Sequence, residues 1–265
     1  MKISAVYALE NNIRFRIGIQ VPLREALGAL VTLGYEGVEL HISDPFALNC
    51  NFLMDNLNEF GLEVSAISTG LSYIKYGYSL CNIDDASREM ALKFFRKYIE
   101  VARILNGGIV VIGLARGRSD SMHHDKAKKK LMDSLQVLND YSKNMGVSLV
   151  LEPLNKNETN LINKVSEAID IIKTLDNVHL LLDTYHIWLE EDIYVALSQY
   201  GKYARHIHVA DTDRLPPGLG KLKWSEIIKI LNSVGYNGYL SVEALMEPNY
   251  FESLKIAIKT LKSCL

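Results

Sequence analysis

Four ionisable side chains recur in the second half of the chain, each at the end of a short apolar run. They are Glu152 in VSLVLEP, Asp183 in VHLLLDTYH, His208 in RHIHVAD and Glu243 in YLSVEAL. Three carboxylates brought together would repel one another, and burying even one unpaired carboxylate is costly. A divalent cation would remove that cost. We therefore predict one divalent cation per chain, bound by these four residues.

The types of the four ligands narrow the choice of ion. Three oxygens and one nitrogen suit Mn²⁺, Mg²⁺ or Co²⁺ in octahedral geometry, with two positions left for substrate oxygens. We predict Mn²⁺, with Mg²⁺, Co²⁺ or Zn²⁺ as alternatives. The competing interpretation is that each residue is an isolated polar group at a strand end. Four such residues in successive units, all on the same face of their strands, argue against it.

The elements that must position these residues are strands that alternate with helices. Short β-branched or apolar runs predict strands, and apolar residues at helical spacing predict helices between them. Strands are expected at 3–7, 37–41, 62–68, 109–113, 147–152, 178–183, 205–209 and 239–243. Helices are expected at 22–33, 51–60, 85–105, 125–145, 165–175, 192–200, 224–234 and 251–261.

Strict alternation of strands and helices predicts a parallel sheet. With 265 residues and no linker, the economical closure is a single (β/α)8 TIM barrel over residues 1–265. An open, doubly wound sheet is the competitor, but no GxGxxG follows the first expected strand. Chemistry in a barrel gathers at the carboxyl ends of the strands, and alternation of side chains points all four residues toward the barrel axis.

Composition excludes several classes of protein. The chain has 29 basic and 31 acidic residues, and 48% of its residues are hydrophobic, which argues against a disordered chain and a dedicated nucleic-acid binder. Its three cysteines form no CxxC pair, so we expect reduced thiols. No apolar run approaches the ~18 residues that span a membrane. We expect a cytoplasmic enzyme with no nucleic-acid or membrane partner.

Three further polar residues stand at short offsets from the four. They are Glu158, six residues after Glu152; His186, three after Asp183; and Arg214, six after His208. With these offsets the chain resembles the xylose-isomerase-like TIM barrel superfamily of sugar and sugar-phosphate isomerases and epimerases. Within it, the chain is most similar to the ketose 3-epimerases of the D-tagatose/D-psicose 3-epimerase type. The resemblance covers nearly the whole chain as a fold and is sharpest over 152–243.

The resemblance implies epimerisation of a ketose at C3 through a cis-enediolate. A cation that binds O2 and O3 of the substrate would stabilise the developing charge as a Lewis acid. Glu152 and Glu243 would be the acid/base pair on opposite faces of the substrate. Asp183 and His208 would be metal ligands only, and His208 would need a hydrogen-bond partner to fix its tautomer.

The resemblance also implies roles for the three offset residues. Glu158 and His186 would hold the O1/O2 end of the sugar, and Arg214 would contact an oxygen further along. The sequence leaves open which sugar is bound and whether it is phosphorylated. Members of the superfamily often associate, so a homo-oligomer, a dimer or a tetramer, is expected.

The first half of the chain offers weaker candidates for substrate binding. Arg116 and Arg118, in GLARGR after the fourth strand, could bind a phosphate or carboxylate, or lie in an exposed loop with salt bridges. Glu39 and His41 share the inward face of the second strand, and His41 is expected to line the pocket unless it is a satisfied polar residue. Tyr7 is expected to form an apolar wall of the pocket or, failing that, to belong to the core.

Several other functions use the same kind of site. An aldose–ketose or hydroxypyruvate-type isomerase would move the proton between adjacent carbons, and an inosose-type dehydratase would expel water. An endonuclease IV-like DNA repair enzyme shares the barrel but needs additional metal ligands. One of these, a histidine, is expected after Asp213–Arg214, where Leu215 stands. A non-catalytic sugar-binding barrel would tolerate loss of Glu152 or Glu243, yet both are present.

Overall fold

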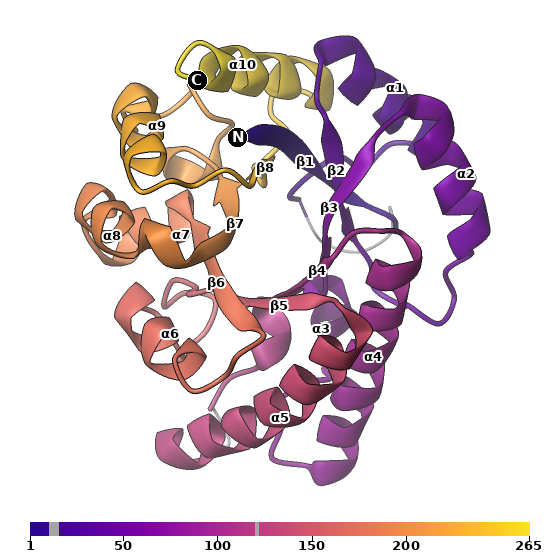
Figure 1. Ribbon diagram of the computed structural model, residues 1–265, viewed down its shortest axis with the longest axis vertical. Helices are drawn as coiled ribbons and strands as arrows, with labels where there is room; N and C mark the ends of the chain where they lie inside the picture. Colours follow the sequence, from indigo (N-terminus) through magenta and orange to yellow (C-terminus); the bar gives the residue numbers. More distant parts are fainter. Residues whose placement is uncertain (11–15, 120–121) are drawn as a thin grey trace.

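The computed structural model describes residues 1–10, 16–119 and 122–265. Eight parallel strands pair in chain order and close into a barrel, which Figure 1 shows at the centre of the molecule. The predicted (β/α)8 barrel is therefore confirmed. The strands are β1 (Lys2–Ala8), β2 (Gly37–His41), β3 (Glu63–Ser68), β4 (Ile109–Ile112), β5 (Ser148–Leu151), β6 (Val178–Asp183), β7 (Ala204–Val209) and β8 (Tyr239–Val242).

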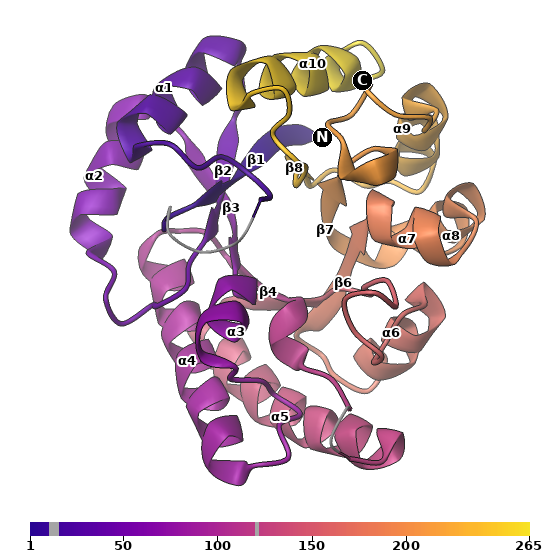
Figure 2. The same cartoon turned by 180° about the vertical axis from the view of Figure 1, so that it is seen from behind.

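Helices surround the barrel in both views (Figures 1 and 2). The α-helices are α1 (Leu23–Leu33), α2 (Cys50–Phe60), α3 (Gly70–Tyr76), α4 (Asp85–Ile104), α5 (His124–Met145), α6 (Val165–Ile172), α7 (Thr184–Glu190), α8 (Ile193–Tyr200), α9 (Trp224–Ser233) and α10 (Tyr250–Lys262). Three short 3-10 helices, η1 (Leu114–Arg116), η2 (Gly201–Tyr203) and η3 (Thr212–Arg214), complete the connections.

Two of these helices are missing from the sequence prediction. Helices α3 and α7 have seven residues each and directly follow strands β3 and β6. Both are too short to show a helical repeat of apolar residues, so the pattern that predicted the other eight helices gives no signal for them. Their position matters because the connections after strands build the site in a barrel.

The hydrophobic core has two parts. The larger part lies between the strands and the helices, and it contains Ile3, Ala5 and Tyr7 of β1. The smaller part lies inside the barrel and consists of Ala66, Val111, Val150 and Leu181, one from each of β3 to β6. Each of these four residues stands two positions before a strand-end residue of the site, so the inner core forms a floor beneath it.

Two further sequence observations can be compared with the structure. The three cysteines, Cys50, Cys81 and Cys264, are free thiols. Within the described ranges, no helix combines the length and the apolar character needed to cross a membrane.

Candidate active site

Four ligand-type side chains from the last four strands meet at the carboxyl end of the barrel. Glu152 directly follows β5, Asp183 ends β6, His208 lies in β7 and Glu243 directly follows β8. All four are buried, and one polar atom from each lies within 4.8 Å of those of the other three. Successive strands thus place three carboxylates and one imidazole around a single point.

The imidazole of His208 faces all three carboxylates through one nitrogen. Its Nδ1 lies 3.2 Å from Oε1 of Glu152, 3.6 Å from Oε2 of Glu243 and 3.8 Å from Oδ2 of Asp183. The donor set is therefore three oxygens and one nitrogen at close range. Such a set suits a divalent cation that prefers oxygen ligands.

Asp183 has a second role as the N-cap of α7. Its Oδ1 accepts hydrogen bonds from the backbone N–H groups of Tyr185 and His186, at 2.7 and 3.2 Å, which fixes the carboxylate. Its Oδ2 is buried and has no hydrogen-bond partner in residues 1–10, 16–119 and 122–265. Because a buried carboxylate oxygen without a partner is costly, this atom fits a metal ligand.

The pKa values of the cluster also fit a bound divalent cation. Burial, with the nearby carboxylates of Glu243 and Glu152, holds the pKa of Asp183 well above its ordinary value. Burial disfavours a charge on His208, but Glu39 and Glu243 outweigh it and hold its pKa well above the usual range. Both shifts favour the protonated forms of Asp183 and His208, and a divalent cation would compete with those protons. The residues present fit such an ion.

The carboxyls of Glu152 and Glu243 differ in their surroundings. Burial raises the pKa of Glu152. Burial acts on Glu243 too, but there His208 and Arg214 outweigh it and lower the pKa. Two carboxyls whose environments push their pKa values apart are the usual arrangement of an acid/base pair.

Arg214 links this cluster to a neighbouring carboxylate. Its Nη1 lies 2.6 Å from Oε1 of Glu158 and its Nη2 lies 2.7 Å from Oε2 of Glu243. The guanidinium also stacks over the ring of Tyr185, with 5.3 Å between its central carbon and the ring centroid. Asp213 and Arg214 both adopt a left-handed backbone, at φ 59 and 58°. Such conformations are uncommon for residues other than glycine and cluster at functional sites.

His186, in α7, turns one nitrogen toward the same carboxylates. Its Nδ1 lies 2.7 Å from the side-chain amide of Asn155, which makes Nδ1 the acceptor and leaves the proton on Nε2. That Nε2 lies 3.9 Å from Oε1 of Glu158 and 3.8 Å from Oδ2 of Asp183. Burial and Arg214 hold the pKa of His186 well below its ordinary value, so the ring is neutral.

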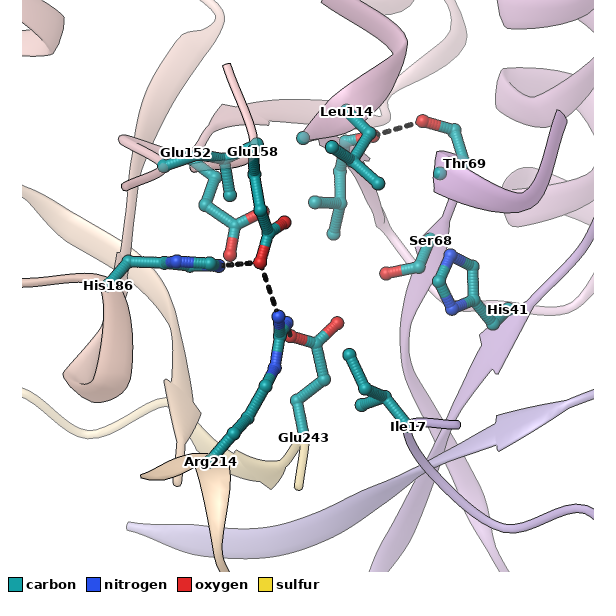
Figure 3. A pocket seen from close by; sticks show the side chains of 14 residues that line it. Ile17, His41, Ser68, Thr69, Leu114, Glu152, Glu158, His186, Arg214 and Glu243 are labelled. Carbon is teal, nitrogen blue, oxygen red and sulfur yellow. Dashed lines mark hydrogen bonds and ion pairs between the residues drawn. The ribbon is translucent and has the colours of Figure 1, made fainter. Parts of the chain in front are cut away.

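These side chains open into one small cavity of about 40 Å³. Figure 3 shows two walls that face each other across it. All three carboxylates of the lining lie on one wall with His186 and Arg214, and the other wall is formed by Ile17, His41, Ser68 and Leu114 with their neighbours. The full lining is Ile17, His41, Ser68, Thr69, Gly70, Val111, Gly113, Leu114, Glu152, Leu154, Glu158, His186, Arg214 and Glu243.

Three candidates for substrate binding are not among the residues that line the cavity. Arg116 is fully buried, and its guanidinium donates hydrogen bonds to backbone carbonyls, among them those of Gly113 and Leu161. Arg118 donates to the backbone carbonyl of Glu158, at 2.9 Å. Tyr7 faces the helices, and its hydroxyl donates to the carbonyl of Val21. The structure thus gives each of the three a hydrogen bond to the protein backbone, and none of the three is among the residues that line the cavity.

The structure adds three residues that the sequence patterns did not single out. Asn155 orients His186, Ser68 lines the second wall, and Gly113 makes room for Glu152. A Cβ atom on Gly113 would lie only 2.7 Å from Oε2 of Glu152. None of the three carries a charge or repeats at a fixed spacing. Ser68 and Gly113 stand at the end of a predicted strand and Asn155 three residues beyond one, and this position was their signal in the sequence.

Fold and site together define the class of this protein. It is a (β/α)8 barrel with a buried carboxylate–imidazole cluster at the carboxyl ends of its strands. Comparison with known families is more specific. Residues 27–264 match the xylose isomerase-like TIM barrel family, and the chain belongs to that family.

Similar proteins within this group act on sugars. A D-psicose 3-epimerase of Ruminiclostridium cellulolyticum is 36% identical over 118 residues, which cover 43% of this chain and 40% of that relative. An L-ribulose 3-epimerase of a Methylomonas species is 25% identical, over 83% of this chain and 78% of the relative. A 3-dehydro-D-guloside 4-epimerase of Escherichia coli is 26% identical, over 76% and 81%.

A solved structure shares the whole fold. The D-psicose 3-epimerase of Clostridium cellulolyticum H10, determined with D-tagatose, superimposes with a TM-score of 0.85. The match covers 100% of this chain and 99% of that chain at 22% sequence identity. The likeness in fold therefore covers the full length of this chain.

Proposed function

We propose that this protein is a divalent-metal-dependent ketose 3-epimerase. The observation that carries the proposal is the buried cluster of Glu152, Asp183, His208 and Glu243, two of which, Glu152 and Glu243, line the cavity. The relatives named as D-psicose and L-ribulose 3-epimerases support the same reaction. Mn²⁺ is the proposed ion, because three oxygens and one nitrogen suit its preferences.

The reaction needs a C–H bond beside a carbonyl to become acidic and a proton to return on the opposite face. A cation bound by the cluster would act as a Lewis acid that stabilises the negative charge of the enediolate. Glu152 and Glu243 come from β5 and β8, which are not neighbours in the barrel, so their carboxyls reach the substrate from different directions. In this proposal one removes the C3 proton and the other delivers a proton to the opposite face.

The residues around the cluster would hold the sugar. His186 presents Nε2–H toward Glu158 and Asp183, where it can donate to a substrate oxygen. Glu158 would accept a hydrogen bond from a hydroxyl at the ketose end. Arg214, which contacts both Glu158 and Glu243, would bind an oxygen further along the chain.

Charge in the cavity favours an unphosphorylated sugar. Of the described residues that line it, Arg214 is the one permanent cation, and it already contacts two carboxylates. Arg116 and Arg118, the candidates for binding a phosphate or carboxylate, donate hydrogen bonds to backbone carbonyls. A phosphate dianion would therefore meet mainly negative groups, which is unfavourable in a buried site.

A 4-epimerase is the second candidate, because one relative is named a 3-dehydro-D-guloside 4-epimerase. Removing the proton from C4 of a 3-keto sugar is the same chemistry, displaced by one carbon. The isomerase and dehydratase alternatives also begin with an enediolate. The 3-epimerase, the 4-epimerase, the isomerase and the dehydratase differ in the carbon atom that exchanges its proton or loses its oxygen.

Hydrogen–deuterium exchange separates these reactions. The Mn²⁺-loaded protein, exchanged into Mg²⁺ for NMR, is incubated in D₂O with free ketoses, ketose phosphates and 3-keto sugars. We expect deuterium at C3 of a free ketose. Deuterium at C4 of a 3-keto sugar identifies the 4-epimerase, and deuterium at C1 or C2 identifies an isomerase. Exchange in none of them, with metal bound, contradicts the proposal.

The role of Asp183 as a ligand is tested separately from turnover. A ligand that binds only the folded state stabilises it by about 2.7 kcal/mol at a concentration of 100 times its Kd. We expect Mn²⁺ to raise the Tm of the wild type in this way. The Asp183→Asn variant should lose most of the increase, because the amide is a weaker ligand and carries no charge. An equal increase in both proteins would remove Asp183 from the metal site.

A further inference from the structure

A second buried group lies beside the four-residue cluster and shares one member with it. It consists of Glu39, His206 and His208, whose ligand-type atoms lie within 4.8 Å of one another. Glu39 is on β2 and has no exposed surface, like His206 on β7. The mechanism proposed above uses neither residue, so the structure must explain why a carboxylate is buried there.

The carboxylate of Glu39 is surrounded by hydrogen-bond donors. Its Oε1 lies 3.0 Å from Nε2 of His208 and accepts a hydrogen bond from the hydroxyl of Ser68. Its Oε2 lies 2.8 Å from Nε2 of His206. Both oxygens are therefore fixed, one by β3 and β7 and the other by β7. A carboxylate held at both oxygens cannot rotate, so it presents a rigid acceptor to His208.

This contact determines which nitrogen of His208 is free. An imidazole that donates through Nε2 to a carboxylate has Nδ1 left for a metal. The Nδ1 atom of His208 is the one that faces Glu152, Asp183 and Glu243, at 3.2 to 3.8 Å. The two nitrogens thus point to two different groups, one to the carboxylate of Glu39 and the other to the candidate ligands.

We propose that Glu39 is a positioning residue that holds His208 with Nδ1 directed at the bound cation, while His206 and Ser68 hold Glu39 itself. This inference rests on the proposed metal dependence. Glu39 lies on β2 and His208 on β7, so closure of the barrel brings the two residues together.

The group of Glu39, His206 and His208 could instead bind a second cation. The hydrogen bonds argue against that arrangement. Nε2 of His208 cannot both donate its proton to Glu39 and ligate a metal, and both oxygens of Glu39 already face donors. The stoichiometry of metal binding distinguishes the two arrangements, because a second site would give two ions per chain.

The test compares Mn²⁺ binding in the wild type and in Glu39→Gln, with electron paramagnetic resonance of free Mn²⁺ as the readout. Loss of a hydrogen-bond partner of a metal-bound histidine weakens metal affinity by about 10- to 100-fold, and we expect that effect here. The visible spectrum of the Co²⁺-loaded protein should change too, because the imidazole becomes a poorer donor. Glu36→Gln is the matched control, since Glu36 accepts from the backbone N–H of Ile3 near the start of the same strand.

A second variant, Glu39→Asp, keeps the inference testable if Glu39→Gln does not fold. Glu39→Asp keeps the charge but withdraws the carboxylate by one methylene, so it should also weaken Mn²⁺ binding while the control stays at the wild-type Kd. Wild-type Kd and Co²⁺ spectrum in the folded Glu39 variants would overturn the inference, as would two ions per wild-type chain. Absence of any metal binding by the wild type would instead contradict the proposed function.

Discussion

Two sectors of the barrel interior support the site in different ways. In β3 to β6, the residues two positions before the strand-end groups are apolar: Ala66, Val111, Val150 and Leu181. In β7 and β2, the equivalent residues are His206 and Glu39, which are bonded to each other. The first sector holds its strand ends by packing, and the second holds His208 by hydrogen bonds.

The difference follows from the groups that are supported. Glu152 has two equivalent oxygens, and the backbone N–H groups of α7 already fix one oxygen of Asp183 and leave the other for a cation, so an apolar floor is enough beneath both. The two nitrogens of an imidazole differ in whether they carry a proton, but they fill almost the same space. Packing therefore cannot distinguish them. Only a hydrogen-bond partner can select the tautomer and ring orientation. A polar floor therefore lies under His208, whereas an apolar floor lies under Glu152 and Asp183.

The largest effect is expected at the proposed acid/base pair. Glu152→Gln and Glu243→Gln keep the shape of the side chain but remove the group that transfers the proton. General acid–base catalysis contributes about 10²- to 10⁴-fold, so we expect kcat for epimerisation and for C3 exchange in D₂O to fall by that factor. A wild-type rate in either variant would show that the substituted glutamate does not transfer the proton.

Loss of packing in the apolar sector should reduce stability rather than metal affinity. Leu181 is fully buried beneath Asp183, and Leu→Ala substitutions in cores cost about 2–5 kcal/mol. We expect that decrease in the free energy of unfolding of Leu181→Ala, measured by urea denaturation of the metal-free protein. The Mn²⁺ Kd should change less than in Glu39→Gln. An equal loss of Mn²⁺ affinity would mean that the two sectors support the site in the same way.

A smaller effect is expected at Gly113, which belongs to the apolar sector. A Cβ there would lie 2.7 Å from Oε2 of Glu152, so Gly113→Ala must displace that carboxylate. Because a misplacement of 1 Å can cost 10²-fold in rate, a shift of a fraction of an ångström should lower kcat by about tenfold. Gly28→Ala is the control, since the nearest atom to its Cβ, on Phe60, is at 3.7 Å. Equal rates in the two variants would show that the position of Glu152 is not limiting.

The fold could be predicted because its signals are local. Every strand begins and ends within one residue of the range expected from the sequence. Apolar runs mark the strands, and glycines at helix ends, such as Gly61 and Gly146 in left-handed conformations, mark the breaks. Helix α7 could not be predicted, because it begins directly at Asp183 and is only seven residues long.

The partners of the site residues could not be predicted, because they arise from closure of the barrel. Glu39 and His208 are 169 residues apart, and no spacing along the chain indicates that they meet. Arg116 shows the same limit, since GLARGR has the composition of an exposed loop. Its guanidinium is nevertheless buried and bonded to backbone carbonyls, and burial lowers its pKa to about 10.

The smallest effect is expected at Tyr7, on the helix side of β1. Its hydroxyl donates to the carbonyl of Val21 at 3.1 Å and is not part of the cavity lining. A single hydrogen bond of this kind contributes about 0.5–1.5 kcal/mol to stability, so Tyr7→Phe should lower the free energy of unfolding by roughly that amount. Its kcat/KM should stay at the wild-type value, because the ring remains in the outer core. A fall in kcat/KM without loss of stability would place Tyr7 at the substrate after all, and would extend the functional lining to the outward face of β1.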